Sequence, residues 1–80
     1  MRVTALYFAG LRERAGRATS EEEVAPGTTV AALWESIRAR PEFQGALAAP
    51  GFSVNGEWTR ASRVLEAGDE VGFLPPVSGG

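Results

Sequence analysis

Apolar and polar residues alternate in one segment near each end of the chain. Residues 2–9 combine β-branched and aromatic side chains with a period of two, and residues 70–74 repeat this pattern just before two prolines. A period of two places successive side chains on opposite faces of a strand. We therefore predict a first strand closed by Gly10 and a last strand that ends before Pro75.

The clearest element between these strands is a helix that begins after Thr28 or Thr29, either of which is a suitable N-cap. Pro41 is expected to end this helix because proline cannot continue the hydrogen-bond ladder. Apolar residues recur in this stretch at i, i+3, i+4 and i+7, the spacing of one helical face. They are Val30, Leu33, Trp34 and Ile37.

Shorter elements complete the pattern. Residues 11–15 predict one helical turn before Gly16, and residues 21–24 predict a polar edge strand. Asn55-Gly56 predicts a type I′ hairpin that joins strands at 52–54 and 57–59, whereas residues 42–51 look irregular. The order β-β-α-β-β-β predicts an α+β fold, a mixed sheet of about five strands covered by one main helix. The helix suits a right-handed crossover, so the first and last strands are expected to lie parallel at the centre.

Parity along the two central strands predicts one apolar corner on the face away from the helix. Val3, Ala5, Tyr7, Val71 and Phe73 share the face expected to meet the helix. The opposite face begins polar and becomes apolar toward the strand ends, where Leu6, Phe8 and Leu74 gather and Trp58 of the hairpin joins them. We interpret this corner as a protein interface, although a small domain also leaves some apolar surface exposed.

Composition narrows the chemistry that the chain can perform. The 80 residues are 44% hydrophobic and 22% charged, which suits one small globular domain spanning residues 1–80. The sequence contains no Cys and no His, and all eight of its basic residues are Arg. Thiolate and imidazole metal sites, Cys or Ser-His nucleophile systems and lysine Schiff bases are therefore excluded, so a self-sufficient enzyme is not expected.

Charge and hydropathy exclude two further classes of partner. The net charge of -2 disfavours nucleic acid, which needs a basic face. No apolar run approaches the ~20 residues of a membrane span, and the N-terminus lacks the pattern of a secretory signal. We expect a cytoplasmic protein that binds neither nucleic acid nor membrane.

The last six residues suggest a reactive arm, residues 75–80. Pro75 and Pro76 stiffen its exit from the last strand, and five extended residues reach about 15 Å. Gly79 and Gly80 have no side chain, so they can thread a narrow channel and present an unhindered main-chain carboxylate. A frayed terminus is the plainer interpretation of such an ending.

The C-terminal part of the chain resembles one particular family. Residues 65–80, with Gly-Asp-Glu-Val at 68–71 and Pro-Pro-Val-Ser-Gly-Gly at 75–80, are similar to the C-terminus of the molybdopterin synthase small subunit. That family belongs to the ubiquitin-like β-grasp sulfur carriers. Residues 3–14, 28–40 and 54–57 are similar to its first strand and turn, its helix and its hairpin, whereas residues 42–51 carry no resemblance.

The resemblance implies a mechanism in which the chemistry belongs to partners. An activating enzyme related to those that activate ubiquitin uses ATP and Mg²⁺ to adenylate Gly80, and sulfur then replaces the adenylate to give a thiocarboxylate. The large synthase subunit, in an expected heterotetramer, accepts the arm and passes the sulfur to cyclic pyranopterin monophosphate. The resemblance implies that Gly79, Ser78, Val77, Pro76 and Pro75 thread the partner's site, that Phe8, Trp58 and Leu74 pack on the large subunit, and that the chain itself binds no metal or cofactor.

Several alternatives remain open. Other sulfur carriers, for thiamine, tRNA thiolation or amino acid synthesis, also end in Gly-Gly, and a ubiquitin-like protein modifier would use the same activation chemistry. A β-grasp interaction module without covalent chemistry is the third alternative. Because the sequence has no Lys or Cys, an activated Gly80 meets no side-chain amine or thiol on its own chain, a benefit that an Arg-favouring genome would also produce by chance.

Other candidate features have plainer explanations. The carboxylates at 21–23 suggest a metal or basic-partner site, but three neighbouring acids more often form a solvated edge that discourages strand pairing. Residues 12–14 suit a surface turn better than a partner contact. Tyr7 and Trp34 lie on apolar faces and are expected in the core.

Overall fold

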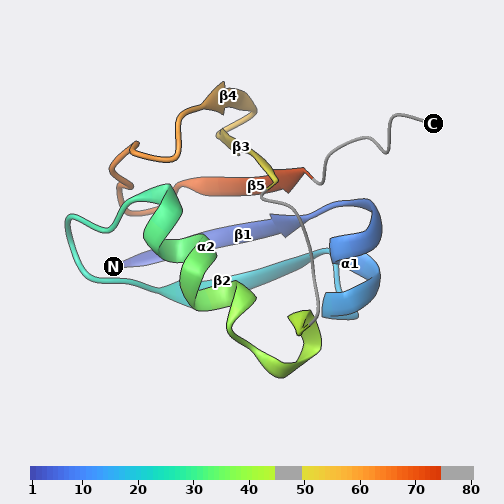
Figure 1. The fold of residues 1–80 in the computed structure, drawn as a ribbon. Coiled ribbons are helices and arrows are strands. Elements are labelled where there is room, and N and C mark those ends of the chain that lie inside the picture. The colour runs from blue at the N-terminus through green and yellow to red at the C-terminus, as the bar shows by residue number, and fades with distance from the viewer. Residues whose placement is uncertain (45–49, 75–80) are drawn as a thin grey trace.

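Five strands form one mixed sheet with a helix packed across it (Figure 1). The computed structural model describes residues 1–44 and 50–74. The strands lie in the order β2-β1-β5-β3-β4. In chain order the elements are β1 (Arg2–Tyr7), α1 (Ala9–Ala15), β2 (Thr19–Glu23), α2 (Val30–Arg38), the 3-10 turn η1 (Pro41–Phe43), β3 (Gly51–Val54), β4 (Glu57–Thr59) and β5 (Glu70–Leu74).

The first and last strands lie side by side in the middle of the sheet. β1 and β5 are parallel, and the other three pairings are antiparallel. A parallel pair needs a long crossover, and α2 lies within it, on one face of the sheet (Figure 1). The predicted order of five strands and one main helix is confirmed, and the topology is that of a β-grasp fold.

Helix α2 begins where its capping residue predicts. The Thr29 hydroxyl oxygen accepts a hydrogen bond from the Ala32 amide at 3.1 Å, satisfying one of the free donors of the first turn. The predicted apolar stripe is buried against the sheet, and so are the inward-facing residues of β1 and β5. These core residues include Val30, Leu33, Trp34, Ile37, Val3, Ala5, Tyr7, Val71 and Phe73.

Two local predictions were wrong. β1 ends at Tyr7 rather than at Ala9, because the chain turns into the seven-residue helix α1, where the amides of Leu11 and Arg12 bond to the Phe8 carbonyl. Leu11 is buried and anchors this helix, so it is longer than the single turn expected. The stretch after Pro41 is also more regular than predicted, since η1 places Phe43 in the core at 2% exposure.

The turn before β5 explains the Gly-Asp-Glu-Val sequence. Gly68 adopts a positive φ of 86°, which suits glycine, and directs the chain into the buried Asp69. The Asp69 carboxylate accepts hydrogen bonds from Asn55 Nδ2 at 3.0 Å and from the Glu66 amide at 2.8 Å. Asn55 in turn accepts the Glu70 amide at 2.9 Å, so the predicted hairpin is fastened to the start of β5.

Both helices of the described residues are short. α1 has seven residues and α2 has nine, and neither is long and apolar enough to cross a membrane.

Candidate functional site

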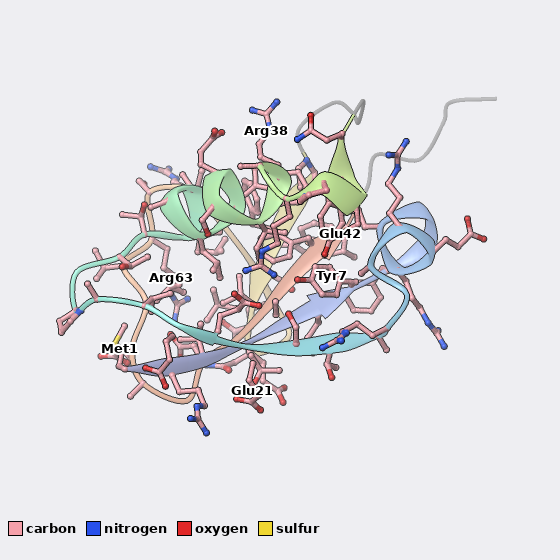
Figure 2. The ribbon with its side chains drawn as sticks, turned by 90° about the horizontal axis from the view of Figure 1, so that it is seen from below. Met1, Tyr7, Glu21, Arg38, Glu42 and Arg63 are labelled. Atoms are coloured by element: carbon pink, nitrogen blue, oxygen red, sulfur yellow. The ribbon has the colours of Figure 1, made fainter. Side chains whose placement is uncertain are left out.

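The sheet has two faces of different character. α2 lies over one face, and we call the opposite one the outer face. In Figure 2, Tyr7 and Glu42 lie between the sheet and the helical layer, whereas Glu21 extends from the outer face. Residues paired across strands share a face, so strand register assigns the outer-face positions. One such row runs across all five strands and consists of Thr19, Leu6, Gly72, Ser53 and Trp58.

The outer face is acidic at one end and apolar at the other. At the start of β1, the exposed residues Glu21 and Glu23 of β2 pair with Thr4 and Arg2, and Glu70 of β5 lies on the other side of Thr4. At the opposite end, β1 and β5 finish with apolar side chains. This gradient is the one that parity predicted.

The apolar corner of the outer face, as we call it, consists of Leu6, Phe8, Trp58 and Leu74. Phe8 is 42% exposed and Trp58 is 72% exposed, unusual values for such large apolar side chains. The Phe8 ring and the Leu74 side chain both lie against Gly72: a Cβ built on this glycine would be 3.3 Å from Phe8 Cε2 and 3.6 Å from Leu74 Cδ1.

Trp58 joins the same corner through a second glycine. A Cβ built on Gly51 would be 2.6 Å from Trp58 Cζ3, and Gly51 pairs directly with Leu74. The structure therefore brings the three predicted interface residues together at the end of β5. Their role in binding a partner stays a prediction, because the structure contains this chain alone.

The predicted reactive arm begins where the apolar corner lies. Leu74 is the last residue of β5, and the arm starts at the next position. Pro75, Pro76, Val77, Ser78, Gly79 and Gly80 lie outside the described residues, and their assigned roles remain predictions.

A polar hollow lies on the opposite side of the sheet, between β2 and η1. Its volume is about 390 Å³, and its lining includes Tyr7, Ser20, Glu22, Arg40 and Glu42. The Tyr7 hydroxyl and Ser20 Oγ are 2.9 Å apart, and Ser20 Oγ donates to Glu22 at 2.7 Å. Arg40 binds Glu22 with both terminal nitrogens. These groups satisfy one another, so the network is suited to joining β2 to the helical layer.

Electrostatic interactions in this network favour the ion pair between Glu22 and Arg40. Burial opposes ionisation of Glu22, but the hydrogen bonds from Arg40 and Ser20 outweigh it and lower the pKa of this carboxyl. The hydrogen bond to Glu22 raises the pKa of Arg40, and burial raises the pKa of the Tyr7 phenol. Tyr7 therefore remains neutral and Glu22 charged at neutral pH.

The weaker candidate features have structural roles. Residues 21–23 form part of an edge strand, where Glu22 pairs with Arg40 while Glu23 pairs with Arg2 at 3.2 Å. Within residues 1–44 and 50–74 no group of three or more acidic, His or Cys side chains could hold a metal ion. Arg14 of α1 donates to the carbonyl of Gln44, the residue after η1, at 3.0 Å, an exposed contact within the chain. Tyr7 and Trp34 are in the core, as predicted.

Sequence reasoning missed the two glycines beneath the aromatic side chains. Gly51 and Gly72 lie in strands without a positive φ, so a turn does not explain them. A glycine within a strand pattern is a general signal of close approach by another group. The identity of the approaching ring follows only from the fold.

Comparison with known proteins places the chain in a family. Residues 5–80 match the ThiS family model. The chain is 36% identical to the molybdopterin synthase sulfur carrier subunit of Chlamydomonas reinhardtii over 83 residues, with 100% of both chains covered. It is 35% identical to the subunit of the same name from Mycobacterium tuberculosis over 82 residues, with 100% of this chain and 99% of the relative covered.

Solved structures have the same fold. SAMP1 from Haloferax volcanii, a small archaeal modifier protein, matches with a TM-score of 0.83 and 28% identity, covering 100% of both chains. A chain in the protein–protein complex of subunits 1 and 2 of the molybdopterin-converting factor from Helicobacter pylori matches with a TM-score of 0.71, 18% identity and full coverage of both chains, a likeness of fold alone. Since the family model covers nearly the whole sequence and two sulfur carrier subunits match it from end to end, the chain belongs to the ThiS family of β-grasp proteins.

Proposed function

We propose that this chain is the sulfur carrier subunit of a molybdopterin synthase. The observation that carries the proposal is the apolar corner, which includes Phe8, Trp58 and Leu74 and lies where β5 ends and the Gly-Gly arm begins. A docking surface beside a terminal arm lets one binding event both hold the partner and deliver the chain end to it. Full-length identity of about 35% to two sulfur carrier subunits of molybdopterin synthase supports the assignment.

The proposed chemistry takes place at the main-chain carboxylate of Gly80. A carboxylate is a poor electrophile, so an activating enzyme first joins it to the α-phosphorus of ATP, releasing pyrophosphate. A sulfur nucleophile supplied by a partner then attacks the acyl carbon and displaces AMP, leaving a thiocarboxylate. ATP and Mg²⁺ belong to the activating enzyme, and this chain supplies the positioned acyl group.

Delivery of the sulfur requires the large synthase subunit. In the proposed complex the apolar corner packs on that subunit while residues 75–80 enter its active site, where cyclic pyranopterin monophosphate receives the sulfur. The Helicobacter pylori complex shows that a chain of this fold is found with subunit 2 of the molybdopterin-converting factor. A dithiolene contains two sulfur atoms, so two charged carriers are needed for each molybdopterin, and this stoichiometry suits a heterotetramer.

Deletion of Gly80 tests the proposal. The purified chain, its activating enzyme, a sulfide source, ATP and Mg²⁺ are combined, and intact mass reports the exchange of one oxygen for sulfur. The charged chain is then mixed with the large subunit and cyclic pyranopterin monophosphate, and molybdopterin is measured. We expect the deleted chain to fold and bind the large subunit like wild type but to form neither thiocarboxylate nor molybdopterin.

Molybdopterin formation by the deleted chain would refute the proposal. A matched control is Val64→Ala, an exposed position outside both the arm and the apolar corner, which leaves the terminal carboxylate in place and should still accept sulfur. Failure of the wild-type chain to bind the large subunit would also overturn the assignment.

Similarity to a small archaeal modifier protein favours one second candidate, attachment of Gly80 to amines of other proteins. The same acyl adenylate would then be attacked by a lysine amine instead of sulfur. Recovery of a tagged chain from native cells separates the two functions. A modifier appears on larger proteins as a bond stable to denaturation, whereas a sulfur carrier appears as the free chain with the sulfur mass difference.

A further inference from the structure

The two strand glycines beneath the apolar corner lack the usual reasons for glycine. Neither Gly51 nor Gly72 has a positive φ. Glycine within a strand weakens it, because glycine loses more conformational entropy on folding than other residues and has no side chain that could pack. Gly72 is also buried in β5, where a side chain would normally contribute to packing. A close approach by another group is the remaining explanation: the Trp58 ring at Gly51, and the Ser53 hydroxyl together with the Phe8 ring at Gly72.

The ring over Gly51 is that of Trp58. The three atoms nearest to a Cβ built on Gly51 all belong to this indole, at 2.6, 3.4 and 3.6 Å. Cζ3 lies much closer than its two ring neighbours, so the indole meets Gly51 by this edge, while Trp58 remains 72% exposed. Any side chain at position 51 would lift the ring from the sheet.

The ring over Gly72 is that of Phe8. A Cβ at position 72 would lie 3.3 Å from Phe8 Cε2 and would also collide with Ser53 Oγ. Phe8 lies between the end of β1 and α1, so the ring has no strand partner of its own to hold it. Contact with Gly72 therefore helps to hold the Phe8 ring in place.

We propose that Gly51 and Gly72 are positioning residues that leave room for the Trp58 and Phe8 rings to pack against the outer face and so preform the docking surface for the large synthase subunit. This inference rests on the proposed function, since it requires a partner that binds the apolar corner. An aromatic ring already fixed in its bound position loses little conformational freedom on binding. The two glycines therefore act on affinity through the rings and need not touch the partner.

The test for Gly51 is a double-mutant cycle with Gly51→Ala and Trp58→Ala, with binding to the large subunit measured by calorimetry. Gly51→Ala alone should weaken binding about tenfold, because the displaced indole must be reordered. In the Trp58→Ala background the same change should alter the Kd by less than about twofold, since the ring through which it acts is absent. Gly10→Ala is the matched control, because nothing lies within 4 Å of a Cβ there.

A spectroscopic readout separates positioning from a general loss of structure. The edge of the indole next to Gly51 should shift the nearer Gly51 α proton downfield through its ring current, and Trp58→Ala should abolish this shift. In Gly51→Ala, the indole N–H signal of Trp58 should move while the signals of the helix side, such as those of Leu33, stay in place.

The test for Gly72 needs a second substitution. Gly72→Ala is combined with Ser53→Ala, which removes the hydroxyl that would collide with the new methyl group. The double variant should fold, and it should bind the large subunit about tenfold more weakly than Ser53→Ala alone. In a background that carries both Phe8→Ala and Ser53→Ala, the added Gly72→Ala change should have no further effect.

The outcomes distinguish this inference from the proposed function. If wild type binds the large subunit but the effects of the glycine and aromatic substitutions on the binding free energy are simply additive, the positioning role is wrong and the docking assignment stands. The same holds if Gly51→Ala leaves both the Trp58 signal and the affinity unchanged. If wild type does not bind, the proposed function itself fails.

Discussion

Removal of the Trp58 side chain should weaken binding to the large subunit strongly while changing the stability of the fold only slightly. The indole is 72% exposed and extends from the edge strand β4, so the folded chain gains little from it. We expect Trp58→Ala to change the free energy of unfolding by less than about 1 kcal/mol, as for other surface substitutions. The same change should strongly weaken binding to the large subunit.

The size of the binding effect follows from the exposed area. A tryptophan side chain offers up to about 250 Å² for burial, so the 72% still exposed corresponds to up to about 180 Å². At about 25 cal/mol per Å², complete burial at an interface contributes up to about 4.5 kcal/mol, and less where the ring is only partly covered. Part of this is offset by ordering of the interface, about 1 kcal/mol for a side chain of this kind. We therefore expect a loss of about 2–3 kcal/mol, or about 30- to 150-fold in Kd.

The assay is titration of the purified large subunit with wild-type and substituted chains, with urea denaturation of each free chain alongside. Val64→Ala is the matched control, because Val64 is also a large apolar residue, 55% exposed, but lies in the loop before β5 and not in the apolar corner. A Kd for Trp58→Ala within threefold of wild type would refute the reasoning. So would an equal loss for Val64→Ala.

Three further predictions concern stability. Asp69→Ala should destabilise the fold by about 2 kcal/mol in urea denaturation, because the Glu66 amide loses its acceptor; an unchanged midpoint would contradict this. Phe43→Ala should cost about 3–4 kcal/mol in the same assay, since the ring is 2% exposed, and a loss below about 1 kcal/mol would show that η1 is not part of the core. The pKa of Glu22 is lowered on folding, so the stability it adds is present above its ordinary pKa of 4.5 and is lost as the pH falls through the lower folded value. Glu22→Gln should therefore be about 1 kcal/mol less stable than wild type at pH 7, with the gap closing below pH 4.5 in thermal melts; a gap independent of pH would refute the role of the Arg40 pair.

Local patterns along the chain were sufficient to predict most of the architecture. The helical spacing from Val30 to Ile37, the Thr29 cap and the Asn55-Gly56 turn each depend on residues close in sequence, and each is present in the structure. Alternation along β1 and β5 also separated the buried face from the outer face correctly. Two predictions failed where a distant contact decided the outcome. Leu11 and Phe43 each bury a side chain in the core, and this drives a helix and a 3-10 turn where local residues indicated a loop or a single turn.

The candidate site, like the fold, was predicted from the sequence only in part. The amino-acid sequence by itself determined which residue types are available: no Cys, His or Lys, a Gly-Gly ending, and three large apolar residues at Phe8, Trp58 and Leu74 on one predicted face. Only the tertiary structure decided that Phe8 lies against Gly72 and Trp58 against Gly51, and that the partner of Glu22 is Arg40. Periodicity assigns a side chain to a face, because backbone geometry repeats along a strand. It cannot assign the neighbour across the sheet, because strand order and register are set by contacts between residues far apart in the chain.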